Sequence, residues 1–247
     1  QEDLRIQGHA IEARICAENP DNNFLPATGA LNVYALPECV TFERANVSDS
    51  GVAVRVDSGV RQGDAISPFY DSMVAKLIVH GDTREQALAR LDEALAQTHI
   101  VGLATNVQFL RLVARSPSFA HAQLDTALIE REAEVMFHQE KVGLPLAAAA
   151  AVAQALLEER GSETADPFSK RDGWRSHGLT TRRFGLEFHG VAHTALLTFL
   201  HDGALHLQVG DVSGVLLFTS VAAGIDLQFA GQRQTVNVWR QGETDHV

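Results

Sequence analysis

Short runs of alternating apolar and polar residues fill the first part of the chain and predict both strands and helices. Four runs are typical of β-strands, at residues 9–16, 30–36, 54–60 and 73–80. The last of these is dense enough in apolar residues to indicate a buried strand. The polar stretch at residues 45–54 contains SDSG and predicts a loop.

Two amphipathic helices are predicted after these strands. Each opens on the pattern Thr-x-x-Gln, which is typical of a capping box: Thr83 with Gln86, and Thr105 with Gln108. The apolar stripe of the first helix lies at Leu88, Leu91 and Leu95. The second helix is expected to stop before Pro117. A third, short helix is predicted at residues 126–137.

The pattern changes near residue 145. Proline is tolerated at a helix start, so Pro145 is expected to open a helix that runs to Arg160. This segment is apolar on nearly every side and is therefore expected to be buried on every side. From residue 174 onward, turn signals separate short alternating runs, which predict an antiparallel sheet closed as a barrel or folded as a sandwich. We interpret the helix as the plug of such a barrel.

These patterns predict an α+β protein of two domains, residues 1–140 and 141–247. A chain of 247 residues with 45% hydrophobic residues is long enough to bury two modest cores. The net charge of −11 argues against nucleic acid or an anionic membrane as a partner, because both require a basic face. No apolar run approaches the length of a membrane helix, and the first residues do not form a signal peptide.

Common catalytic and metal motifs are not found. Cys16 and Cys39 form no disulfide framework, and His189 and His193 lie in a strand-like region without further ligands nearby. The chain has no nucleophile elbow and no P-loop, so the sequence predicts no metal site and no such hydrolytic chemistry.

Four segments resemble the carboxyl-terminal part of a biotin carboxylase, the ATP-dependent part of biotin-dependent carboxylases. They are GHAIEARICAENP at residues 8–20, VRVDSGV at 54–60, SPFYDSMVAKLI at 67–78 and VGLATN at 101–106. The resemblance extends from about residue 8 to about residue 129. The glycine-rich ATP-grasp loop and the biotin-attachment sequence of the family are not present. The chain is therefore expected to be an interior piece of a larger enzyme and to be inactive alone.

Arg55 is the candidate catalytic residue, and the resemblance implies that it binds bicarbonate and biotin. On the predicted strand its side chain points away from the face of Val54 and Val56, so its guanidinium is expected to be free for a ligand. The resemblance implies that ATP and bicarbonate react and that biotin loses a proton. A permanently charged, planar guanidinium would stabilise the negative charge of this reaction. From the residues alone, Arg55 is an ordinary exposed strand arginine.

Other site candidates are weaker. Tyr70 and Asp71 precede an apolar strand and could line the same cleft as substrate-binding residues, or simply form a turn. Thr126 occupies the position at which the last helix of the family approaches adenine, which makes it a candidate for ATP binding. Glu12, Arg14 and Lys76 are expected to be solvated or paired charges on strands.

The helix and small sheet of the second domain resemble the inter-subunit BT domain of α subunits of the 3-methylcrotonyl-CoA carboxylase type. Soft matches to the same subgroup lie at NFLP (23–26) and VRQGD (60–64) in the first domain and at DPFS (166–169) in the second. The resemblance implies biotin on a carrier domain outside this chain, ATP with Mg or Mn, and an ATP-grasp part of the same subunit. It also implies a carboxyltransferase β subunit as partner, in bacterial cytoplasm or the mitochondrial matrix. Geranyl-CoA, propionyl-CoA or another acyl-CoA remains open as substrate. A non-catalytic adaptor and a small-molecule-binding barrel also remain open.

Overall fold

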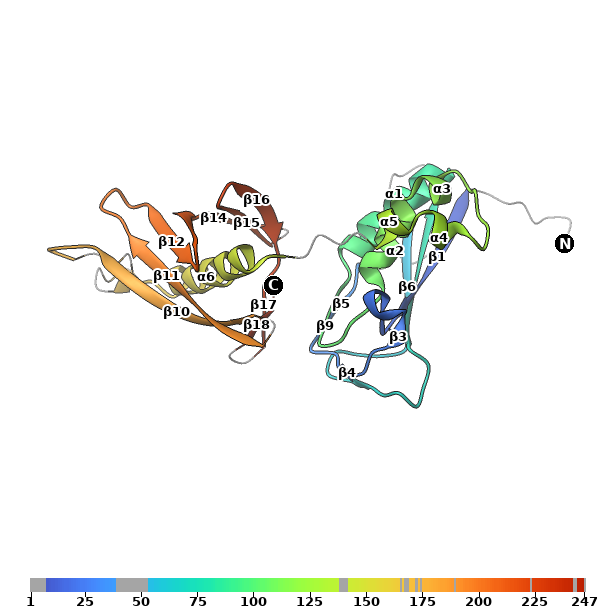
Figure 1. Cartoon of the computed structure of the whole chain (residues 1–247), viewed down its shortest axis with the longest axis horizontal. Coiled ribbons are helices and arrows are strands. Elements are labelled where there is room, and N and C mark those ends of the chain that lie inside the picture. The colour runs from blue at the N-terminus through green and yellow to red at the C-terminus, as the bar shows by residue number, and fades with distance from the viewer. Residues whose placement is uncertain are drawn as a thin grey trace, which may run out of the picture. The chain divides into compact units, whose positions relative to one another are not determined.

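The computed structural model describes residues 8–38, 53–137, 142–164, 166, 169–171, 173, 175–188, 190–222, 224–241 and 244–246. Most of the loop predicted at residues 45–54 and the middle of the DPFS segment lie outside these ranges. The chain divides into two compact units, Gln1–Glu140 and Lys141–Val247, which are called unit 1 and unit 2 (Figure 1). In the described ranges, no helix has the length and apolarity needed to cross a membrane.

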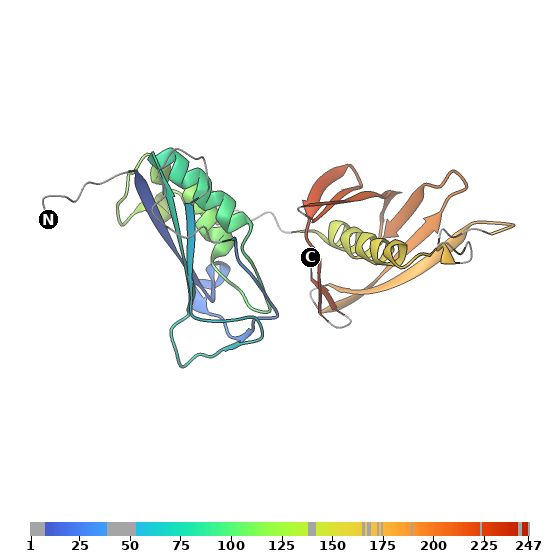
Figure 2. The same ribbon diagram turned by 180° about the vertical axis from the view of Figure 1, so that it is seen from behind.

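Unit 1 is built on a three-stranded antiparallel sheet. Its order is β1 (His9–Cys16), β8 (Met73–Gly81) and β6 (Ala53–Ser58), and all three strands lie where the sequence predicts them. Figures 1 and 2 show the helices stacked against one side of this sheet. They are α1 (Arg84–Ala96), α2 (Val107–Arg115), α3 (Pro117–Ala120), α4 (Leu128–Arg131) and α5 (Ala133–Met136).

Pairs of very short strands extend unit 1 beyond the sheet. The pairs are β2 (Glu18–Asn19) with β3 (Leu25–Pro26), β4 (Gly29–Ala30) with β7 (Ala65–Ile66), and β5 (Val33–Ala35) with β9 (His99–Val101); a 3₁₀ turn, η1 (Pro20–Asn22), follows β2. The single strand predicted at residues 30–36 is therefore divided between β4 and β5. It is interrupted where Leu31 turns fully into the core and the Asn32 amide donates to the Val101 carbonyl at 2.8 Å.

The core of unit 1 lies between the sheet and the helices. Alternate residues of the strands, such as Ile15, Val54 and Leu77, pack against the apolar stripe of α1. The predicted stripe of Leu88, Leu91 and Leu95 is buried, with exposed fractions of 8%, 3% and 1%. Since side chains of a strand alternate between faces, the polar residues between the buried ones must point to the opposite face. That face carries the candidate site.

The two predicted capping boxes have different outcomes. Thr83 caps α1, because its hydroxyl accepts from the Gln86 amide at 3.3 Å, although the Gln86 side chain accepts from the amide of Asp82 and not of Thr83. The prediction of a capping box at Thr105 is wrong, since α2 begins one residue later, after Asn106. The helix predicted at residues 126–137 is two single turns, α4 and α5.

Unit 2 combines one long helix with antiparallel strands. The helix, α6, spans Leu144–Gly161 with a proline in its first turn, as predicted. One sheet has the order β10 (Thr180–Phe188), β11 (Val191–Phe199), β12 (Leu205–Val209) and β13 (Val212–Val215). A second has β14 (Leu217–Val221), β15 (Gly224–Phe229) and β16 (Gln232–Val236), and a third pairs β17 (Trp239–Gln241) with β18 (Thr244–His246).

The strands described in unit 2 do not close into a hydrogen-bonded barrel. The first two sheets separate at Leu216, between β13 and β14. The Leu216 side chain is 1% exposed within the core, and its amide donates to the Leu205 carbonyl at 2.8 Å, so the chain crosses from one sheet to the next at this residue. The expected antiparallel strands are therefore present, whereas the closed barrel is not.

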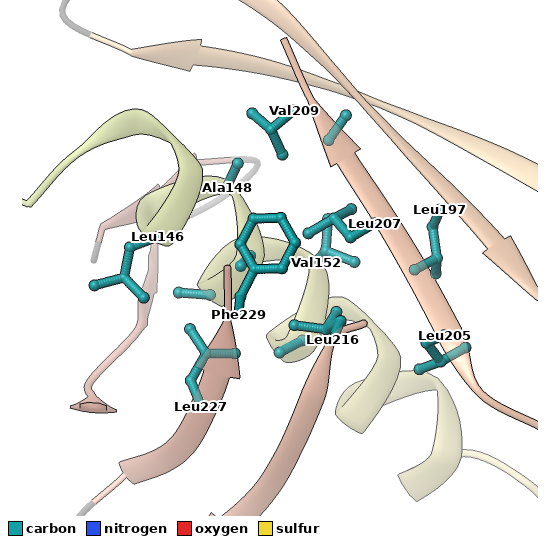
Figure 3. Close-up of a cluster of buried hydrophobic side chains, with 14 of the residues drawn as sticks. Leu146, Ala148, Val152, Leu197, Leu205, Leu207, Val209, Leu216, Leu227 and Phe229 are labelled. Carbon is teal, nitrogen blue, oxygen red and sulfur yellow. The ribbon is translucent and has the colours of Figure 1, made fainter. Parts of the chain in front are cut away.

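Helix α6 nevertheless supplies the centre of the unit 2 core. Figure 3 shows Leu146, Ala148 and Val152 of the helix in one cluster with Leu207 and Phe229 of the strands. Alanines at the buried positions allow the strands to approach the helix closely, and Leu156 fills the wider space near its end. The helix is not buried on every side, however, because Ala147, Ala151 and Ala155 form a partly exposed stripe along it.

The end of α6 is tied to the strands by ion pairs. Glu159 accepts two hydrogen bonds from Arg182 of β10, both at 2.6 Å, and Glu158 pairs with Arg240 of β17. The hydrogen bonds from Arg182 hold the pKa of Glu159 below its usual range. Arg160 lies over the ring of Phe218, 4.8 Å from its centroid. These contacts fix the helix relative to three different strands.

We expect Ala150→Glu to unfold unit 2 and leave unit 1 folded. Ala150 is 0% exposed, and an unpaired carboxylate buried there would offset much of the ~5–15 kcal/mol that stabilises a typical domain. Both tryptophans, Trp174 and Trp239, belong to unit 2, so their fluorescence reports that unit separately. Amide resonances of unit 1 should remain dispersed while the tryptophan emission shifts to that of exposed indole.

Ala155→Glu is the matched control, because it places the same side chain in the same helix on the partly exposed stripe. It should retain native tryptophan emission. If Ala150→Glu also retains it, α6 is not the core of unit 2.

Candidate functional site

The candidate site lies on the face of the unit 1 sheet opposite the helices. Strand β6 places it there, because Val54 is 2% exposed and packs with the core while Val56 lies beside it in the same cluster. Arg55 and Asp57 alternate with these valines and are exposed on the opposite face. The register pairs Arg55 with Ile78 and Asp57 with Lys76 of β8.

Arg55 makes a two-point contact with Asp57. Its Nε donates to Oδ1 of Asp57 at 2.8 Å, and its Nη2 donates to Oδ2 at 2.9 Å. These hydrogen bonds raise the pKa of the guanidinium above its ordinary value, so Arg55 stays charged. The expectation that the guanidinium is free is therefore corrected. One edge of it is occupied by Asp57, and the pair remains open to solvent, with 59% of the arginine and 43% of the aspartate side chain exposed.

Further charges surround this pair on the same face. Across the sheet, Lys76 lies between Asp57 of β6 and Arg14 of β1, and Arg14 pairs with its neighbour Glu12 at 3.5 Å. The expectation of paired charges at Glu12 and Arg14 is confirmed. Three cationic and two anionic side chains thus share one exposed sheet face, which suits it to a small anion more than to a cation.

Tyr70 and Asp71 lie beyond the start of β8. The Tyr70 side chain is almost fully exposed, and Asp71 Oδ1 accepts from the Met73 amide at 3.0 Å, which is the turn-forming role that Asp usually plays. Met73 precedes Ile78, the partner of Arg55, by five residues, or roughly 17 Å along a strand. The structure does not bring Tyr70 and Asp71 into contact with Arg55.

Thr126 lies in the segment between α3 and α4 and is exposed. No hydrogen bond or ion pair among the described residues joins Thr126 to Arg55, whose side chain contacts Asp57. Thr126 and Arg55 therefore remain separate candidates.

Three structural residues hold the site strands in place, and the sequence patterns do not identify them in this role. Tyr34 and Ser58 share a hydrogen bond of 2.8 Å between their hydroxyl groups at the end of β6, and burial raises the pKa of Tyr34. Asn106 fixes β1: its Oδ1 accepts from the Cys16 amide at 2.8 Å and its Nδ2 donates to the Arg14 carbonyl at 3.1 Å. An Asn at the start of a helix is expected to cap that helix. Only the tertiary fold shows that the Asn106 side chain bonds to a strand.

The described residues fit an anion and do not fit a metal ion. Nowhere in the described ranges do three or more His, Cys, Asp or Glu side chains gather as ligands. The N–H groups of Arg55 that Asp57 does not use could receive a carboxylate, bicarbonate or phosphate oxygen. No step can therefore be assigned to a metal on these residues, whereas binding of an oxyanion can be.

Two family models match the chain, one over each unit. Residues 12–131 match the biotin carboxylase C-terminal domain, and residues 143–247 match the BT domain of the methylcrotonyl-CoA carboxylase α subunit. The chain belongs to the biotin carboxylase family. Unit 1, with the outward Arg55, matches the C-terminal domain of this family, and unit 2, with α6, matches the BT domain of the methylcrotonyl-CoA carboxylase α subunit.

Named relatives and a solved structure agree with these models. The mitochondrial methylcrotonoyl-CoA carboxylase α subunit of Dictyostelium discoideum is 39% identical over 185 residues, covering 72% of this chain, and that of Mus musculus is 32% identical over 222 residues, covering 86%. The biotin carboxylase domain of Hydrogenobacter thermophilus 2-oxoglutarate carboxylase, solved with MgADP, ADP and bicarbonate, has a TM-score of 0.50 and 32% identity over 57% of this chain. The chain spans 25%, 29% and 28% of these three proteins.

Asn106→Ala should destabilise the biotin carboxylase C-terminal domain. Asn106 is 7% exposed, and its loss leaves the Cys16 amide and the Arg14 carbonyl without their partner, at an expense of about 1–3 kcal/mol. Urea unfolding of the chain, followed by circular dichroism, measures the change. Hydrogen exchange at the Cys16 amide should accelerate.

Thr105→Ala is the control, because the structure gives the helix start to Asn106 and not to Thr105. It should leave the unfolding midpoint nearly unchanged. Equal destabilisation by both variants would indicate that Thr105 caps α2 after all.

Proposed function

We propose that this chain is part of the α subunit of a biotin-dependent acyl-CoA carboxylase and that unit 1 contributes to ATP- and bicarbonate-dependent carboxylation of biotin. The observation that carries the proposal is the outward Arg55 of a half-buried strand within the matched biotin carboxylase domain. The other groups of the reaction would come from the ATP-grasp part of the same subunit. The relatives, of which this chain spans less than a third, have room for such a part.

In this proposal Arg55 stabilises negative charge during the reaction. Biotin supplies the ureido nitrogen that accepts the carboxyl group. When biotin loses its ureido proton, its ureido oxygen becomes negative. This oxygen then lies near the negative oxygens of bicarbonate or phosphate, and a cationic group lowers the energy of that arrangement. Arg55 suits this task, because it stays charged beside Asp57 and offers N–H donors in a plane that matches a carboxylate.

We propose a separate, positional role for unit 2. Its described residues show no group of metal ligands, and its interior is filled by α6 together with leucines and Phe229. A filled interior favours a docking domain over a barrel that holds a small molecule in its lumen. We further propose that the three sheets act together as a barrel-like shell around α6, which docks the carboxyltransferase β subunit within reach of the biotin carrier domain.

The acyl-CoA is proposed from the relatives. Both α subunits compared above are named for methylcrotonoyl-CoA, and the match of residues 143–247 is to the BT domain of that enzyme type. We therefore propose 3-methylcrotonyl-CoA as the substrate of the holoenzyme, with ATP, Mg or Mn, and carrier-bound biotin as its other requirements. Unit 2 would then set where the carboxyltransferase binds and not which acyl-CoA it accepts.

Arg55→Ala, in a full-length subunit that carries this chain, should lower biotin carboxylation by ~10²–10³-fold, the loss typical of a removed oxyanion donor. Its melting temperature should stay nearly unchanged, because the side chain is largely exposed. Bicarbonate-dependent carboxylation of free biotin, measured with labelled bicarbonate, gives the rate.

Arg55→Lys keeps the charge but not the planar fork, and should also be slow. Arg14→Ala is the matched control, since it removes an exposed arginine from the same sheet face. Near-normal carboxylation by Arg55→Ala would show that the residue is an ordinary surface charge.

Replacing residues 143–247 of the full-length subunit by a flexible linker should dissociate the β subunit while carboxylation of free biotin continues. The reason is that the proposed docking surface and the proposed carboxylation site lie in different units. Size-exclusion chromatography with the β subunit and the free-biotin assay measure the two properties separately. The point variants Ala150→Glu and Ala155→Glu provide a matched pair, because only the first should weaken assembly. Assembly that survives the replacement would reject the docking role.

A further inference from the structure

Asp57 contacts Arg55, the side chain whose positive charge stabilises the reacting anion in the proposed function. We propose that Asp57 is a positioning residue, which holds the Arg55 guanidinium by one edge and thereby directs its other edge toward the reacting anion. This inference rests on the proposed function of Arg55. It adds a residue that neither the sequence patterns nor the relatives' names identify.

The geometry of the pair divides the guanidinium into an occupied and an available edge. Arginine has five N–H donors in a fixed plane. Asp57 takes the side edge, formed by Nε and Nη2, at 2.8 and 2.9 Å. Both N–H groups of Nη1 and the second N–H of Nη2 remain. One N–H of Nη1 and the second N–H of Nη2 point in parallel and form the end edge. That edge can bind the two oxygens of a carboxylate, bicarbonate or phosphate side by side.

The strand fixes the backbone from which both side chains of this contact extend. Arg55 and Asp57 are two residues apart on β6, so they point to the same face, and the core packing of Val54 fixes that face. One residue further, Ser58 is held by the Tyr34 hydroxyl at 2.8 Å and donates to the Val60 carbonyl at 2.8 Å. The aspartate backbone is therefore anchored on both sides, whereas an arginine without a partner would sample many rotamers.

Stability does not explain the pair. Exposed ion pairs contribute little to folding, since water screens their attraction and both side chains lose freedom. With 59% and 43% of their side chains exposed, Arg55 and Asp57 form such a pair. What the contact does accomplish is orientation: it fixes a planar donor group in one direction before the anion arrives. Preorganised donors of this kind increase the rate, because no reorganisation is needed during the reaction.

The test uses Asp57→Asn in a full-length subunit that carries this chain. Asparagine keeps the size of the side chain and one acceptor oxygen, but its NH₂ group cannot accept from Nη2, so the two-point contact is lost. We expect kcat for carboxylation of free biotin to fall about 10-fold, with the KM for ATP and the melting temperature nearly unchanged. Asp57→Glu restores the carboxylate and should recover part of the rate.

Asp226→Asn is the matched control. Asp226 of β15 makes the same kind of two-point contact in unit 2, because Nε and Nη2 of Arg233 donate to its two oxygens at 3.2 and 2.6 Å. Its kcat for carboxylation of free biotin should equal that of the unaltered subunit. In the 247-residue chain itself, the ¹⁵N–¹H signal of Arg55 Nε should shift and exchange faster with water in Asp57→Asn and stay unchanged in Asp226→Asn.

A double-mutant cycle separates positioning from an independent role. If Asp57 acts through Arg55, then Asp57→Asn should cause no further loss in an Arg55→Ala background. An additional 10-fold loss there would overturn the positioning role. So would a normal kcat for Asp57→Asn while Arg55→Ala is impaired, and this result would leave the proposed function of Arg55 intact. If Arg55→Ala itself is normal, the proposed function fails and the positioning role fails with it.

Discussion

The burial of Val54 determines which residues of unit 1 can take part in chemistry. Because side chains alternate along a strand, placing Val54 in the core forces Arg55 and Asp57 to the opposite face. A slip of one residue against β8 would turn both charges into the apolar layer and both valines toward water. The antiparallel pairing of β6 with β8 prevents this slip, so the register of one short strand orients the candidate site. The helices of unit 1 cover the other face of the sheet, which carries the apolar side chains.

Unit 2 depends on a similar constraint with a different geometry. Its central helix has almost no polar face, so it is stable only when strands cover it. Small alanine side chains bring the strands close, while Glu158 and Glu159 end the apolar segment with carboxylates that reach arginines of β17 and β10. The helix thus defines the interior, and the ion pairs at its end fix its position along the strands. A domain built this way is suited to presenting an outer surface, because its interior has no further task.

Much of this arrangement could be predicted from the sequence, because period-2 and helical patterns report burial directly. The strands that carry the site, the apolar stripe of α1 and helix α6 were predicted in this way. The predictions fail where a residue bonds to a partner that is distant in the sequence and not to a local one. Asn106, not Thr105, is the residue before α2, and its side chain bonds to β1 without capping the helix. Leu216 takes the chain from one sheet to another, where a barrel would have continued. Local patterns contain no information about such distant partners.

The contact between Arg55 and Asp57 is local, because the two residues lie on the same short strand. Alternation predicts that they share a face, and it therefore places an acceptor beside the candidate donor. A strand arginine can contact the side chain two residues away as readily as a ligand, so Arg55 is not an isolated charge. The pairing does not contradict a role in binding an anion, since a guanidinium has two edges and the aspartate occupies one. An acidic neighbour two residues along a strand is thus a sign that an exposed arginine is oriented, and the direction of its free edge is the property that a substrate would meet.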